Sequence, residues 1–122
     1  MMSETGTLLL YIMLFFTSIM SCKPLAAVSP EAQIYYDTSV AALVESPKCL
    51  SCHVSGGAAG HTALVFIQSG TNKNAQNSSQ FNSIISTFNS QYVLNKIKGI
   101  NHGGAEQYSE FTPAYQNFVT FF

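Results

Sequence analysis

"SPKCLSCHVSGG", residues 46–57, has two cysteines three positions apart and a histidine directly after the second. The whole chain of 122 residues contains only three Cys and three His, so this grouping is unlikely to arise by chance. Three kinds of chemistry use such a pattern. Cys49, Cys52 and His53 could form a redox dithiol, part of a zinc site, or the covalent attachment site of a haem.

The rest of the sequence discriminates between these three readings. A structural zinc site needs four ligands, and after the motif only His61 and His102 remain, far apart in the sequence. A thioredoxin-like dithiol needs alternating strands and helices, and the chain shows helical patterns without convincing parallel strands. Haem attachment needs only two thiols to bond the porphyrin and an imidazole to bind iron. The sequence therefore predicts one covalent haem c, held by Cys49 and Cys52, with His53 as proximal iron ligand.

The N-terminal residues indicate export. Residues 7–20, "TLLLYIMLFFTSIM", are continuously hydrophobic but shorter than the roughly 20 residues that a membrane span needs. Such a run is typical of a secretory signal, although the preceding residues carry no Lys or Arg. We predict a signal peptide over residues 1–27. The alternative is a lipoprotein signal that ends at residue 21 and leaves Cys22 lipidated. The protein is then periplasmic, or anchored to the membrane by that lipid or an uncleaved signal and facing the periplasm.

Charge limits the partners of the exported part. From Lys23 onward the chain has five Lys, five Asp or Glu and no Arg, so its net charge is near zero. Binding to nucleic acid or to an anionic membrane surface needs a basic excess, which is missing here. We predict one domain over residues 28–122 that binds no nucleic acid.

Hydrophobic spacing predicts a mostly α fold. The ranges are helices over 29–45, 78–98 and 109–121, a polar surface loop over 68–79, and an apolar run over 61–66 that spacing alone leaves undecided. Ser29 is the predicted cap of the first helix. Asn77 with Gln80 should start the second helix, and Gly99 should end it. Ser109 or Thr112 should cap the third.

This order of helices around "CLSCH" resembles a single-haem bacterial c-type cytochrome domain of class I, over residues 29–122. The resemblance implies a small cytochrome c-like helical fold around one covalently bound haem. Class I domains usually bind iron with a Met on the distal side, but the four Met of this chain are residues 1, 2, 13 and 20. The predicted domain therefore has no Met ligand.

His102 is the predicted distal ligand in place of that Met. It lies in "KIKGINHGG", residues 96–104, between two predicted helices, where the family's Met loop usually falls. The segment also resembles an H-G-G-G stretch of some bacterial cytochrome c domains, with Ala105 in place of the third Gly. His61 and an open sixth position are the alternatives.

Two axial histidines leave no site for a small ligand, so the expected function is electron transfer rather than catalysis. The expected partners are redox partner proteins or a larger respiratory complex, and Lys48, Lys96 and Lys98 are candidates for docking them. The alternatives are a haem-based gas sensor or small peroxidase with an open sixth position, or a haem-carrying structural subunit of a larger redox complex. The lack of Arg disfavours a peroxidase, which needs a cationic group beside the iron.

Overall fold

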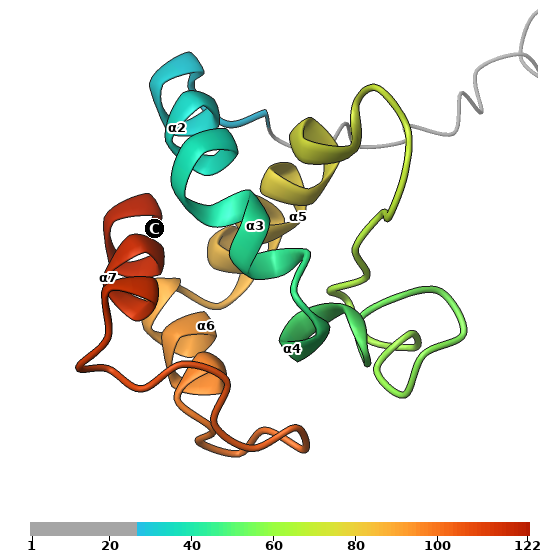
Figure 1. Cartoon of the computed structure of the whole chain (residues 1–122), viewed down its shortest axis with the longest axis vertical. Helices are drawn as coiled ribbons and strands as arrows, with labels where there is room; N and C mark the ends of the chain where they lie inside the picture. Colours follow the sequence, from blue (N-terminus) through green and yellow to red (C-terminus); the bar gives the residue numbers. More distant parts are fainter. Residues whose placement is uncertain (1–26) are drawn as a thin grey trace, which may run out of the picture.

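The computed structural model describes residues 27–122, and every regular element in that part of the chain is a helix, as the sequence predicts. The predicted signal peptide and Cys22 lie outside the described residues, except for Ala27. Figure 1 shows the arrangement of α2 (Pro30–Tyr35), η1 (Tyr36–Val40), α3 (Ala41–Val44), α4 (Pro47–Leu50), α5 (Lys73–Thr87), α6 (Ser90–Ile97) and α7 (Pro113–Phe121). None of these helices is long and apolar enough to cross a membrane.

The first predicted helix is confirmed, with one wider turn inside it. α2, η1 and α3 follow one another without a break, and Ser29 caps the start by accepting a hydrogen bond from the Ala32 N–H at 3.2 Å. η1 is a π-helical turn, an arrangement often found at functional sites or packing constraints. It places Tyr36 and Val40 in the core, where they are 1% and 0% exposed.

The C-terminal helix α7 packs against this π turn. Asn117 of α7 donates a hydrogen bond to the Ser39 carbonyl at 3.1 Å and accepts one from the Tyr35 hydroxyl at 3.3 Å. The Thr112 hydroxyl caps α7 by accepting from the Tyr115 N–H, as predicted. In Figure 1 the red α7 accordingly lies beside the blue-green N-terminal helix. The two ends of the domain are thus fixed to each other by polar as well as apolar contacts.

The predicted helix over 78–98 is wrong at its start. Helix α5 begins at Lys73, so the latter part of the predicted loop over 68–79 is helical. Asn77 and Ser78 are almost fully buried, and each finds a hydrogen-bonding partner outside its helix. Those tertiary bonds stabilise a polar stretch that local spacing alone assigns to the surface.

The same predicted helix is also interrupted in the middle. α5 ends at Thr87 and α6 begins at Ser90, because the Asn89 side chain accepts a hydrogen bond from the Tyr92 N–H at 2.8 Å and caps a new helix. α6 then ends as predicted, since Gly99 adopts a left-handed conformation with φ of +89° directly after the C-cap Lys98.

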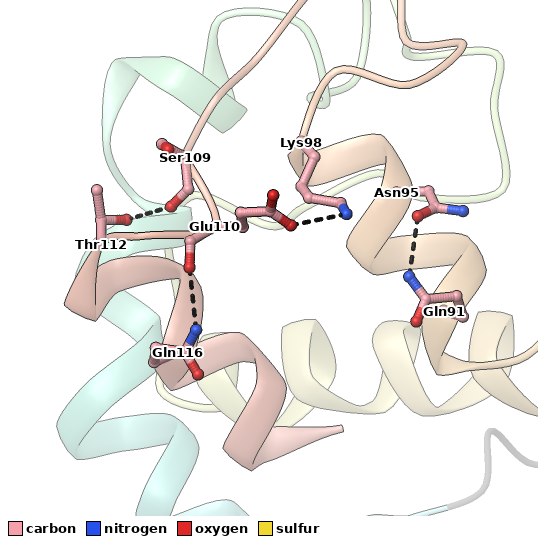
Figure 2. Close-up of polar contacts among 7 residues, drawn as sticks. All are labelled: Gln91, Asn95, Lys98, Ser109, Glu110, Thr112 and Gln116. Carbon is pink, nitrogen blue, oxygen red and sulfur yellow. Dashed lines mark hydrogen bonds and ion pairs between the residues drawn. The ribbon is translucent and has the colours of Figure 1, made fainter.

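One carboxylate connects the end of α6 to the segment before α7. The Lys98 ammonium lies 3.0 Å from the Glu110 carboxylate, and the Gln116 side chain donates to the Glu110 carbonyl at 3.0 Å; Figure 2 draws both contacts. The hydrogen bond to Glu110 is the main reason that the pKa of Lys98 is raised. Both ends of the intervening loop are therefore held in place.

Phe81 of α5 lies at the centre of an aromatic core. Its ring contacts those of five other aromatic residues: Tyr36, Phe66, Phe118, Phe121 and Phe122. Not all of the predicted apolar faces reach this core. Phe88 and Tyr92 are 52% and 39% exposed, and Phe111 is 89% exposed. The first two stack on each other instead, with ring centroids 4.4 Å apart.

Candidate functional site

A cavity of about 560 Å³ lies between α4, α5, α6 and the loop that follows α6. All four residues predicted to hold the cofactor line it: Cys49, Cys52, His53 and His102. The remaining wall is largely apolar and includes Leu64, Phe66, Phe81, Ile84, Val93, Ile97 and Phe118. Ligand sites in proteins commonly combine such an apolar wall with a few polar groups.

The motif straddles the end of α4. Cys49 lies in the helix, which begins at Pro47, and Cys52 and His53 follow in the next turn. Hydrogen bonds from the Cys52 N–H and the His53 N–H to the Cys49 carbonyl, at 3.3 and 3.0 Å, continue the helical winding. Residues four positions apart on a helical turn share a face, so Cys49 and His53 reach the same cavity.

The environment of the Cys49 thiol disfavours its thiolate form. Its burial raises its pKa from 9.0 to about 11, although the neighbouring Lys48 opposes the shift. Thiol exchange starts from the thiolate, which such a pKa makes scarce at neutral pH. Within residues 27–122, moreover, no group of three or more His, Cys, Asp and Glu is placed to hold a metal ion. A haem needs only two axial ligands from the protein, since the porphyrin supplies the other four nitrogens.

The ring of His53 is oriented by a main-chain carbonyl. Its Nδ1 lies 2.8 Å from the Leu64 carbonyl oxygen. Because a carbonyl only accepts, Nδ1 must carry the proton, and Nε2 keeps its lone pair. The ring edge of Phe66 packs against the imidazole at a centroid distance of 6.0 Å. This combination is the usual support of a metal-binding histidine.

His102 has the same kind of support in the opposite wall. Its Nδ1 lies 3.1 Å from the Ala105 carbonyl oxygen, so its Nε2 also keeps a free lone pair. The side chain of Lys96 donates to the Asn101 carbonyl, and that of Lys48 donates to the Gln107 carbonyl at 2.6 Å. These two lysines fix the loop on both sides of His102.

The two imidazoles lie at a separation that suits one metal ion between them. Their centroids are 5.9 Å apart and their planes differ by 17°. Imidazole nitrogens bind first-row metals at about 2 Å, so two rings on opposite sides of one ion have centroids about 6 Å apart. The centroid distance between His53 and His102 therefore lies in the range of two imidazoles that share one metal ion.

His61 lines the same cavity but is exposed and makes no ring contact with His53. The structure thus brings His102, and not His61, beside His53. Of the lysines predicted to dock partners, Lys48 and Lys96 line the cavity, whereas Lys98 pairs with Glu110.

Two residues near the site, Asn77 and Gln80, do not cap the start of a helix as predicted. Asn77 and Gln80 lie inside α5 rather than at its start, and they bond the main chain of residues 65 and 67. The undecided run over 61–66 is consequently neither helix nor strand. Asn77 and Gln80 are three positions apart and so lie on one face of a helix. This spacing is the signal that could have indicated that both bond a neighbouring segment.

Replacing Ala105 with Gly is expected to stabilise the domain by about 1 kcal/mol, because non-glycine residues are strained in the left-handed region. Ala105 has φ of +59° there, between His102 and α7. Chemical denaturation of both proteins measures the difference. Gly103 has no positive φ, and its replacement by Ala meets no atom within 4 Å, so it is the matched control. An unchanged or lower stability of Ala105→Gly would contradict the strain argument.

Comparisons with protein-family models, with curated proteins and with solved structures find no match to this chain.

Proposed function

We propose that the protein is an exported monohaem c-type cytochrome that transfers single electrons. The observation that supports it most strongly is the cavity lined jointly by Cys49, Cys52, His53 and His102, with the two imidazoles 5.9 Å apart. Three of these residues form the C-x-x-C-H motif, and the fourth comes from a loop about 50 residues later in the chain. The motif and the shared cavity together support the proposal of one haem.

Each residue has a distinct part in this proposal. Cys49 and Cys52 would hold the porphyrin, each through a thioether bond formed when its S–H adds across a vinyl group, without net oxidation. His53 and His102 bind the iron through Nε2, the nitrogen that their hydrogen bonds leave free. The bound haem supplies a one-electron couple. The apolar wall excludes water and so limits the reorganisation that accompanies a change of charge.

Two axial imidazoles favour ferric iron more than an imidazole and a thioether do, so the potential should be lower than that of a Met-ligated relative. The proposed partners are redox proteins or a larger respiratory complex that meet the cavity rim, where Lys48 and Lys96 lie. Their ammonium groups give this rim a positive charge, which speeds encounters with acidic partner surfaces.

Covalent haem on the exported protein is the first test. We expect the full chain, expressed in a host with haem-attachment machinery, to keep its haem on a denaturing gel. A Cys49→Ser, Cys52→Ser double variant should lose it, because no thioether can form. Ser51→Ala, which lies between the two cysteines, is the matched control and should retain it. A wild-type chain without bound haem would overturn the proposal.

A further inference from the structure

We propose that Asn77 and Gln80 are positioning residues that tune the strength of His53 as an iron ligand, acting through the main chain of residues 64–67. This inference rests on the proposed function. It assigns a role to two amides of α5 that the haem motif itself does not include. They lie outside the C-x-x-C-H motif, and their effect reaches His53 through a segment with no regular structure.

The two amides hold one edge of this segment. The Asn77 side chain accepts from the Ile67 N–H at 2.8 Å and donates to the Ile67 carbonyl at 3.0 Å. The Gln80 side chain accepts from the Val65 N–H at 2.9 Å and donates to the Val65 carbonyl. The N–H and the carbonyl of Val65 and of Ile67 are therefore all hydrogen-bonded to side chains of α5.

The other edge of the same segment holds His53. The Leu64 carbonyl accepts from the imidazole Nδ1 at 2.8 Å, and the Phe66 N–H donates to the His53 carbonyl at 2.7 Å. The main chain of residues 65 and 67 thus bonds α5, and that of residues 64 and 66 bonds His53. This alternation is the one that an extended chain imposes, because successive residues direct their polar groups to opposite edges.

The segment therefore behaves as a strand whose neighbouring strand is replaced by two side chains. Asn77 is only 1% exposed, and an amide buried to that degree is costly unless all its bonds are made. The bonds that satisfy it also fix the register of the segment and hence the position of the Leu64 carbonyl. A shift in the segment changes the distance from that oxygen to the imidazole directly.

That distance matters because the hydrogen bond at Nδ1 controls how strongly Nε2 donates to a metal. A good acceptor at Nδ1 makes the imidazole more basic and stabilises the ferric state. A weaker bond makes the ferric state less stable and raises the reduction potential. The structure thus connects an amide on α5 to the potential of the iron.

Gln80→Met tests this connection because it keeps the side-chain length and removes both bonds to Val65. We expect covalent haem to remain, the reduction potential to rise, and the His53 Nδ1–H resonance to move upfield as its hydrogen bond lengthens. Gln76→Met, at an exposed position of the same helix, is the matched control and should leave both readouts unchanged. Asn77→Leu should act in the same direction as Gln80→Met through Ile67.

The outcomes separate this inference from the proposed function. A wild-type chain without haem would overturn the proposed function. A haem-bound Gln80→Met protein with lower stability but unchanged potential and Nδ1–H resonance would overturn the inference, because the amide would then be only structural. Should Gln80→Met fail to fold, Gln80→Asn keeps an amide but draws it back by one methylene, and the same two readouts decide.

Discussion

Replacing His102 with Ala is expected to convert a protein that ignores carbon monoxide into one that binds it. In the proposed haem protein, removal of the imidazole would leave His53 as the one protein ligand of the iron, and a ferrous haem with an open position takes up small ligands. The rest of the loop should stay in place, since Lys48 and Lys96 hold it by their bonds to Gln107 and Asn101. The change should therefore be local to the iron.

Absorption spectra of the oxidised, reduced and carbon monoxide-treated protein measure this effect. The wild type should be low-spin in both oxidation states and unchanged by carbon monoxide. His102→Ala should be high-spin and should shift fully on treatment. Its potential should rise as well, because one donor to the ferric iron is lost.

His61→Ala is the matched control, since His61 lines the same cavity but lies apart from the His53 ring. It should give the wild-type spectra. A wild type that binds carbon monoxide would support a gas sensor or a peroxidase in place of an electron carrier. A low-spin His102→Ala combined with a high-spin His61→Ala would transfer the distal role to His61.

The common orientation of the motif residues toward one cavity was predictable because their spacing is local. Cys49 and His53 share one turn of helix, so their sequence separation already determines that they face the same side. The ends of the helices were predictable at Ser29, Gly99 and Thr112 for the same reason, as each cap involves residues only a few positions away.

The course of α5 was not predictable, because it depends on distant partners. A polar stretch around Asn77 becomes helical only when another segment accepts its side-chain bonds, and here that segment lies about ten residues away in the sequence. The break at Asn89 had a local signal that was overlooked, since Asn is a strong helix cap. The helical spacing of hydrophobic residues continues across Asn89, so spacing alone predicts one unbroken helix.

The pairing of His53 with His102 lies between these cases. The lack of Met after residue 20 and the glycines around residue 102 singled out the loop, but the separation of the rings follows from how α6 and the loop pack. The lysines that fix this loop gave no signal, because a bond from an ammonium to a distant carbonyl leaves no pattern in the sequence.

Phe81→Ala is expected to reduce the free energy of unfolding by about 3–5 kcal/mol, the usual cost of removing a fully buried phenylalanine. The ring is 3% exposed and contacts aromatic residues from three parts of the chain, which include Tyr36 of η1, Phe66 and Phe118 of α7. Its loss leaves a cavity that these rigid rings cannot close by small movements. The loss is measured by chemical denaturation of the haem-bound protein, followed by circular dichroism.

Phe111→Ala is the matched control, because that phenylalanine is 89% exposed and its removal should change stability by less than about 0.5 kcal/mol. Phe81 also lines the cavity proposed to hold the haem, so its replacement should loosen that site as well as the core. Thioether bonds keep a haem on the chain even when the fold weakens, so Phe81→Ala should lose stability without losing haem. Equal stabilities of the two variants would contradict the placement of Phe81 at the centre of the core. Release of the haem from Phe81→Ala on a denaturing gel would contradict its covalent attachment through Cys49 and Cys52.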